Sequence, residues 1–136
     1  MKGEILLKPL LFISLLVESL MLNAQGFISK TIQYDGLTRE YSIYVPASYD
    51  GNTNFPLLFN LHGGGGNIAS HIGIADMSPI ADTANFIVVY PQARPDPSDG
   101  NSFNWITKVP GTFDDVPFFS SLIDTIASNY QIDQNR

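Results

Sequence analysis

The sequence predicts an α/β protein in which a β-hairpin opens a mostly parallel sheet. Two short runs, residues 56–61 and 86–90, are dominated by apolar residues, which is typical of strands covered on both faces. A helical stretch lies between them and a longer one, residues 114–130, follows. Strands that alternate with helices indicate a parallel sheet with right-handed crossovers. At 136 residues, the chain is long enough for one domain.

Residues 1–24 have the pattern of a secretory signal peptide. A positively charged start precedes an apolar core over residues 9–22, and Ala24 is the small residue at the expected cleavage site. Glu18 interrupts the apolar core, and a retained anchor is the alternative, although the run is short for a membrane span. We therefore expect a secreted protein, periplasmic or extracellular, with residues 25–136 as its mature domain.

The composition removes several classes of function. A net charge of −6 argues against nucleic acid or an anionic membrane as a partner. The chain has no cysteine, so it has no disulfide, no thiolate ligand and no cysteine nucleophile. The two histidines, His62 and His71, leave little for a transition-metal site, and we expect neither a metal nor a cofactor.

The first element expected in the mature domain is the hairpin. Residues 27–34 and 39–45 both alternate apolar and polar side chains, and the turn pair Asp35-Gly36 lies between them. A proline ends the second run, and a polar loop over residues 47–54 leads to the first buried strand.

A short helix is predicted next, with Ser78 as its N-cap, Pro79 in its first turn and its end near Asn85. The second buried strand follows and is closed by Pro91. Residues 92–113 are rich in Pro, Asp, Ser, Asn and Gly, and this composition predicts a loop.

The last predicted helix, residues 114–130, has two acidic residues at its positive N-terminus and one apolar face. Residues 131–136 lead out of it. The face comprises Val116, Phe119, Leu122, Ile123, Ile126 and Tyr130.

The most informative motif is His62 followed by four glycines, directly after the first buried strand. Glycines let a chain turn sharply and bring backbone N–H groups close to a ligand. Lipases and esterases build half of an oxyanion hole from such a turn. Gly63 and Gly64 are the candidate donors, with His62 and Gly65 supporting the turn. A purely geometric turn and a phosphate-binding turn are alternatives, although the Gly-Lys-Ser/Thr ending of a phosphate loop is missing.

Several segments, taken in order, carry a family resemblance. They are residues 39–46, residues 56–66, residues 86–92, Trp105, residues 113–118 and residues 130–136. Together they resemble the N-terminal half of secreted esterases related to polyhydroxybutyrate depolymerases and to feruloyl or acetylxylan esterases. The resemblance covers roughly residues 30–136 and implies the N-terminal part of an α/β-hydrolase fold. Pro117 departs from the small residue expected there, but it is tolerable in a first helical turn.

The resemblance implies a serine carboxylic-ester hydrolase acting on a polyester or on plant polysaccharide esters. In such enzymes a serine attacks the ester carbonyl, a histidine takes its proton and an acid orients the histidine. The Gly-x-Ser-x-Gly elbow that carries the serine is missing from the sequence, and the acid and histidine normally follow it. We therefore expect all three beyond residue 136, and the chain itself to be inactive.

Several residues admit a second interpretation. His62 resembles a catalytic base, but a structural role fits better because the base of this fold follows the nucleophile. His71 is expected in a loop or on the surface. Ser102 has half of an elbow pattern, without the second glycine or the flanking strand and helix, which favours a loop serine. Trp105 and Phe103 line a substrate pocket or cover the core, and the sequence does not decide between these roles.

Two further expectations concern the acidic pair at the start of the last helix and the edge of the first buried strand. Asp114 and Asp115 form either a pair for acid–base work or, more simply, a helix cap and a first-turn acid. The strand at residues 56–61 normally lies beside the nucleophile strand, so its edge is expected to be bare and the chain to aggregate or remain partly unfolded.

The rival function is a non-catalytic secreted module that binds polysaccharide. Trp105 would serve as its stacking platform, since aromatic faces suit that role. The alternation of strands and helices argues against this class, because binding modules are usually all-β.

Overall fold

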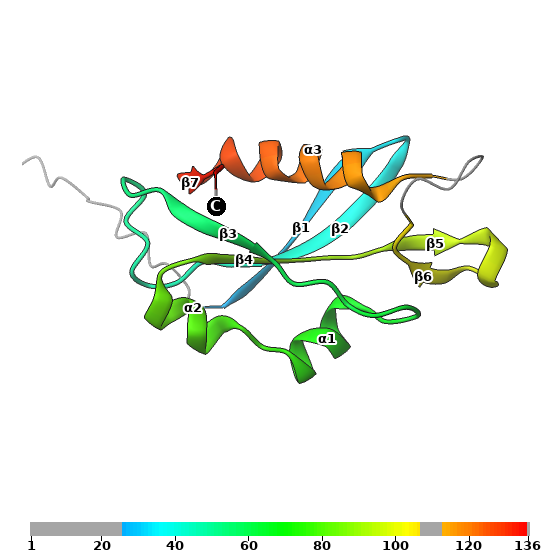
Figure 1. The fold of residues 1–136 in the computed structure, drawn as a ribbon, viewed down its shortest axis with the longest axis horizontal. Coiled ribbons are helices and arrows are strands. Elements are labelled where there is room, and N and C mark those ends of the chain that lie inside the picture. Colours follow the sequence, from blue (N-terminus) through cyan, green and yellow to red (C-terminus); the bar gives the residue numbers. More distant parts are fainter. Residues whose placement is uncertain (1–25, 107–112, 136) are drawn as a thin grey trace, which may run out of the picture.

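The computed structural model describes residues 26–106 and 113–135. A mixed sheet has the strand order β1-β2-β4-β3-β7, with helices on both faces (Figure 1). Its strands are β1 (Phe27–Tyr34), β2 (Leu37–Tyr44), β3 (Phe55–Phe59), β4 (Ile87–Pro91) and β7 (Ile132–Asp133). The helices are α1 (Ile68–Ile74), α2 (Ser78–Ala84) and α3 (Asp115–Ala127). A small second sheet pairs β5 (Arg94–Asp96) with β6 (Ser102–Asn104) around the 3₁₀ turn η1 (Pro97–Asp99).

The predicted hairpin is confirmed as β1 and β2. Both turn residues have positive φ, 51° at Asp35 and 71° at Gly36, as a two-residue turn between twisted strands requires. This tight turn lets the ladder begin at once, with Tyr34 opposite Leu37, so β2 starts two residues before the predicted Arg39. Strand β2 also pairs antiparallel with β4, which attaches the hairpin to the parallel pair β4 and β3.

Strand β4 divides the core between the two helical layers. Ile87 and Val89 pack towards α3, whereas Val88 and Tyr90 pack towards α1 and α2, and all four are fully buried. A strand buried on both faces is therefore apolar at successive positions, as its sequence predicts. In Figure 1, α3 lies on one side of the sheet, and α1 and α2 lie on the other.

Two predictions about the connections are wrong, and one helix was not predicted. Residues 92–106 are not simply a loop, because β5, η1 and β6 form a hairpin within them, and residues 107–112 of the predicted loop lie outside the described residues. Helix α1 was not expected, yet its N-cap Asn67 accepts a hydrogen bond from the Ser70 N–H at 2.9 Å. Ser78 is not the N-cap of α2: that position is Met77, and the Asp76 carboxylate accepts the Ser78 N–H instead. Pro91 is the last residue of β4 and not the residue that follows it.

Helix α3 presents the predicted face to the core except in its first turn. Leu122 and Ile126 are buried in the core, and Phe119, Ile123 and Tyr130 pack against it. Val116 is 45% exposed, whereas Phe118 is completely buried. The Phe118 ring packs against Tyr34 and lies under the Arg39 guanidinium, 3.8 Å from its centroid. These contacts turn the start of α3 towards the hairpin. Asp114 caps the helix by accepting the Val116 N–H at 2.9 Å.

The edge of β3 that faces away from β4 is paired only at its start. Phe55 lies opposite Ile132, and Pro56 lies opposite Asp133. No strand among the described residues pairs with this edge from Leu57 to Phe59. The bare edge expected from the sequence is thus partly covered by β7. Within the described ranges, no helix is long and apolar enough to cross a bilayer.

Candidate functional site

The glycine turn lies at the carboxyl end of the parallel strands β3 and β4. Ligands of open α/β sheets bind at this edge. Gly65 has φ of +71°, and its N–H donates to the Phe103 carbonyl at 2.9 Å. Gly66 donates to the Gly63 carbonyl, and a Cβ on Gly66 would lie only 3.0 Å from that oxygen. The turn therefore depends on glycine at these two positions.

The first two glycines differ from the next two in their hydrogen bonding. No described residue accepts a hydrogen bond from the N–H of Gly63 or Gly64. Both residues are exposed. Asn104 lies beside the turn, because a Cβ on Gly64 would meet its Oδ1 at 3.1 Å. The arrangement thus provides two adjacent N–H donors at the mouth of a turn whose other N–H groups are occupied.

His62 is 3% exposed and uses both ring nitrogens to fasten the turn. Its Nε2 accepts the Ala93 backbone N–H at 3.1 Å, so the ring proton belongs on Nδ1. Nδ1 then donates to the Gly63 carbonyl at 2.7 Å. With both nitrogens engaged, His62 has no free position from which to accept a proton from a substrate or nucleophile. The geometry therefore fits the structural role.

Gln92 is a positioning residue that the sequence did not single out. Its side-chain Nε2 donates to His62 Nε2 at 3.0 Å, and its Oε1 accepts the Ile68 N–H at 3.1 Å. Its backbone N–H donates to the Glu40 carbonyl at 2.9 Å. One side chain thus joins the glycine turn to the start of α1. Its location immediately after β4, at the same sheet edge as His62, is the signal that could have found it.

Trp105 and Phe103 have different environments. Trp105 is half-buried, with its ring centroid 5.1 Å from His62 and 5.4 Å from Phe119, and its Nε1 donates to the His62 carbonyl at 2.8 Å. It packs over the core and supports the turn. Phe103 is 37% exposed and lines a cavity. The sequence did not decide between a core and a pocket position for these two residues. The structure places Trp105 over the core and Phe103 at a cavity.

Asp115 does not form a catalytic pair with Asp114. Its carboxylate is buried and pairs with Arg39, whose Nη2 lies 3.1 Å from Oδ1. The second oxygen accepts the Ile106 N–H at 3.0 Å. Burial lowers the pKa of Arg39, and the neighbouring carboxylate opposes that shift. This pair joins β2, α3 and the segment after Trp105, a link that no local pattern in the sequence indicates.

The remaining candidates lie apart from one another. Ser102 is in β6, opposite Asp96, and among the described residues no histidine or carboxylate makes a hydrogen bond with its hydroxyl. His71 is not in a loop: it is half-buried in α1, with Nε2 2.8 Å from the Asn60 Oδ1. Residues 26–106 and 113–135 contain no cluster of three or more His, Asp or Glu able to hold a metal ion.

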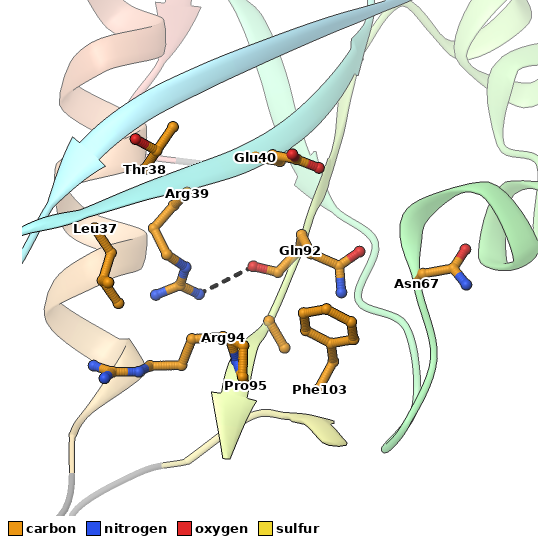
Figure 2. A pocket seen from close by; sticks show the side chains of 10 residues that line it. Leu37, Thr38, Arg39, Glu40, Asn67, Gln92, Arg94, Pro95 and Phe103 are labelled. Carbon is orange, nitrogen blue, oxygen red and sulfur yellow. Dashed lines mark hydrogen bonds between the residues drawn. The ribbon is translucent and has the colours of Figure 1, made fainter. Parts of the chain in front are cut away.

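A cavity of about 500 Å³ lies next to the turn, between the hairpin and the segment that follows β4 (Figure 2). Arg39 forms part of its lining and donates to the Gln92 carbonyl at 3.0 Å. Phe103, Glu40 and Asn67 line it as well, and Figure 2 shows them on three different segments.

No protein-family model and no curated protein sequence matches the chain. Solved structures do. A ferulic acid esterase aligns with a TM-score of 0.59 and 19% identity over 79% of this chain and 44% of its own. An S-formylglutathione hydrolase from Agrobacterium tumefaciens aligns with a TM-score of 0.64 and 16% identity over 83% and 48%. A fluorophosphonate-binding serine hydrolase from Staphylococcus aureus aligns with a TM-score of 0.53 and 14% identity over 82% and 44%.

These similarities concern the fold. The mixed sheet, its helices and the esterase neighbours are together consistent with a partial α/β-hydrolase fold. The chain spans less than half the length of each of these three proteins.

Proposed function

We propose that the chain is the N-terminal part of a secreted serine carboxylic-ester hydrolase and that it supplies half of the oxyanion hole. The observation that carries the proposal is the pair of N–H donors at Gly63 and Gly64, at the carboxyl end of β3, from which no described residue accepts a hydrogen bond. The esterase and serine-hydrolase neighbours support the assignment at the level of the fold.

In this proposal, the glycine turn acts on the tetrahedral intermediate. A serine attacks the ester carbonyl carbon, and the carbonyl oxygen takes up the negative charge. N–H donors that are already fixed in place stabilise this charge without reorganising during the reaction. His62, Gln92 and Trp105 hold the turn rigid, and they do not exchange protons with the substrate.

The nucleophile, its acid and its base would come from sequence that is not among the 136 residues. Strand β7 already lies beside the start of β3 and runs parallel to it. Apolar cavities of about 250 and 300 Å³ adjoin the unpaired part of β3, and Leu57 lines both. A further strand with apolar residues on both faces would cover this edge and bring the nucleophile next to Gly64. Without that strand, the 136-residue chain is expected to be inactive.

The substrate class divides into two possibilities, a polyester and an ester-bearing cell-wall polysaccharide. We also propose that residues 1–24, which lie outside the described residues, direct export to the periplasm or the cell exterior. No nucleic-acid partner or stable membrane span is part of the proposal.

The test uses the longer gene product that this proposal requires, in which a Gly-x-Ser-x-Gly elbow follows Arg136. Gly63→Pro and Gly64→Pro each remove one N–H and are expected to lower kcat by roughly 100- to 1,000-fold on an aryl ester. Gly63→Ala is the matched control, because it keeps the N–H and a Cβ there meets nothing within 4 Å. Thermal melts report whether each variant remains folded. Folded proline variants with unchanged kcat would contradict the oxyanion assignment.

The 136 residues give a second test on their own. Purified residues 25–136 should neither hydrolyse aryl esters nor react with a fluorophosphonate probe. Hydrolysis above background that Ser102→Ala abolishes would overturn the expected inactivity.

A further inference from the structure

Strand β6 and the residue after it contact the glycine turn at three consecutive positions. The backbone carbonyl of Phe103 and the indole N–H of Trp105 both make hydrogen bonds to the turn. Between them, Asn104 holds its Oδ1 where a Cβ on Gly64 would meet it at 3.1 Å. In Figure 1, the β5–β6 hairpin lies beyond the end of β4, beside the loop that leads from β3 to α1. Two of the three contacts fasten the turn, and the third brings a polar atom to its mouth.

Two carboxylates decide which end of the Asn104 amide faces the turn. Its Nδ2 donates to Asp99 Oδ2 at 2.9 Å and lies 3.5 Å from Asp96 Oδ2. The Ser98 hydroxyl and N–H both donate to Asp96 Oδ1 and lower the pKa of that carboxyl, so Asp96 is ionised at neutral pH. An ionised carboxylate only accepts hydrogen bonds, so it binds the NH₂ end of the amide. Oδ1 is thereby turned towards Gly64.

The Asn104 Oδ1 atom is free to accept a hydrogen bond from a ligand. No described residue donates to it, and it is not among the side-chain atoms that are sealed from solvent without a partner. The N–H groups of Gly63 and Gly64, from which no described residue accepts a hydrogen bond, belong to the same mouth. The mouth of the turn therefore combines two donors with one acceptor.

An acceptor in this position is unfavourable unless the substrate brings a donor. The oxyanion that the two N–H groups would hold is repelled by the partial negative charge of Asn104 Oδ1. An apolar acyl chain packed over Oδ1 would remove water from it without replacing the hydrogen bond. A hydroxyl that donates to Oδ1 avoids both costs.

The position of Oδ1 indicates where on the substrate this hydroxyl would be. Oδ1 lies against Gly64 itself, the residue whose N–H would bind the carbonyl oxygen. The hydroxyl must therefore be close to that oxygen, as it is on the carbon next to the ester carbonyl. A hydroxyl on the alcohol part is separated from the carbonyl carbon by the ester oxygen and further carbons, so it lies farther away.

We propose that the site selects esters of 2-hydroxy acids and that Asn104 recognises the 2-hydroxyl group. The hydroxyl donates to Asn104 Oδ1, while the neighbouring carbonyl oxygen accepts from the N–H groups of Gly63 and Gly64. Asp96 and Asp99 act through Asn104 and are positioning residues. The assignment rests on the proposed function for the position of the ester carbonyl, and it names the acyl part, which that function leaves open.

A binding titration on the 136-residue chain tests the proposal without catalysis. Lactate and propionate, which differ by the 2-hydroxyl, are titrated at constant ionic strength into the ¹⁵N-labelled chain carrying Leu57→Lys, which charges the free edge of β3. The carboxylate of each anion stands in for the oxyanion. We expect both anions to shift the amide signals of Gly63 and Gly64. Lactate should also shift the side-chain NH₂ signals of Asn104 and bind about three- to tenfold more tightly.

Variants assign the preference to Asn104. Asn104→Ala should abolish the preference for lactate and leave the affinity for propionate unchanged. Ser102→Ala is the matched control and should keep the preference, because Ser102 lies two residues away on the same face of β6 and its hydroxyl has no partner among the described residues. Asp99→Ala keeps Asn104 but removes its nearer acceptor, so it should reduce the preference by a smaller factor. A variant that only disturbs the turn would weaken both anions together and leave their ratio constant.

Three results would overturn the proposal: no shift with lactate, equal affinity for the two anions in the parent chain, or an unchanged preference in Asn104→Ala.

The longer gene product separates this inference from the proposed function. There the ratio of kcat/KM for ethyl lactate to kcat/KM for ethyl propionate should fall about three- to tenfold in Asn104→Ala, with the value for propionate unchanged. Hydrolysis of both esters with a constant ratio would contradict only the role of Asn104. Hydrolysis of neither ester would contradict the proposed function as well.

Discussion

Strand β3 has two neighbours that secure it to very different degrees. On the β4 side, β3 is paired from Leu57 to Phe59, and the turn that follows it is held by His62, Gln92 and Trp105. The buried Arg39–Asp115 pair also joins the hairpin to α3 on this side. Towards β7, β3 is paired at two residues, and from Leu57 onward that edge adjoins apolar cavities. The side that would hold the oxyanion is already rigid, whereas the side that would receive the nucleophile is open. We infer that the chain carries a preorganised half of a site.

The largest expected effect is on the secured side. Asp115→Ala leaves Arg39 as a buried, unpaired charge and should lower the free energy of unfolding by about 3–5 kcal/mol. Urea denaturation measures the change, in a chain that carries Leu57→Lys to charge the free edge of β3 and limit aggregation. Asp114→Ala, one residue earlier, removes only the helix cap and should cost about 1 kcal/mol. Equal costs for the two variants would contradict the central role of the buried pair.

A pH titration tests the contact between Tyr44 of β2 and Asp82 of α2. Burial and the Asp82 carboxylate, which accepts the Tyr44 hydroxyl at 2.8 Å, raise the pKa of Tyr44 to about 12 from 10.0. A raised pKa means that the contribution to stability is complete below about pH 10 and is lost as the pH rises through 12. The parent should therefore lose up to about 2–3 kcal/mol more than Tyr44→Phe over this range. Parallel losses in the two proteins would show that the contact does not stabilise the fold.

His62 gives the next effect. His62→Phe leaves the buried Ala93 N–H without its acceptor and removes the ring's hydrogen bond to the Gly63 carbonyl, so it should destabilise the chain by roughly 2 kcal/mol. Hydrogen exchange at Gly65 and Gly66 should accelerate as well, since their turn is no longer anchored. His71→Phe is the matched control, because its hydrogen bond to Asn60 lies outside the turn. Slow exchange retained in His62→Phe would refute the anchoring role.

The smallest effect on stability is expected at the open edge. Leu57→Lys should cost about 1 kcal/mol or less but should reduce self-association, because a charged side chain blocks pairing between sheet edges. Light scattering of the unmodified 136-residue chain should show aggregates or a partly unfolded state. A monomeric parent chain with a cooperative melt would show that β7 protects the edge sufficiently.

The sequence predicts the elements whose apolar pattern is long or regular, namely the hairpin, β3, β4 and α3. It misses α1, although Asn67 as N-cap with Ile68 and Ile72 one turn apart is a usable signal. It also misses strands β5 and β6, because their composition is typical of a loop. They form beside the glycine turn, where the Phe103 carbonyl accepts the Gly65 N–H. Long-range contacts of this kind decide structure without leaving a local pattern.

The candidate site shows the same division. The glycine motif identifies the turn, because the required backbone geometry is written in consecutive residues. The partners that hold it, Gln92 and Trp105, come from 30 and 43 positions away, and Asp115 lies 76 positions from Arg39. Spacing alone therefore did not reveal Gln92, and it assigned Asp115 only as a first-turn acid.

The most direct test of the central claim is to read the gene immediately 3′ of the Arg136 codon in all frames. The account predicts a short apolar strand followed by Gly-x-Ser-x-Gly, which would continue β7 along the open edge of β3 and deliver the nucleophile to the glycine turn. Unrelated sequence in every frame would contradict the claim that this chain is the oxyanion half of a serine ester hydrolase.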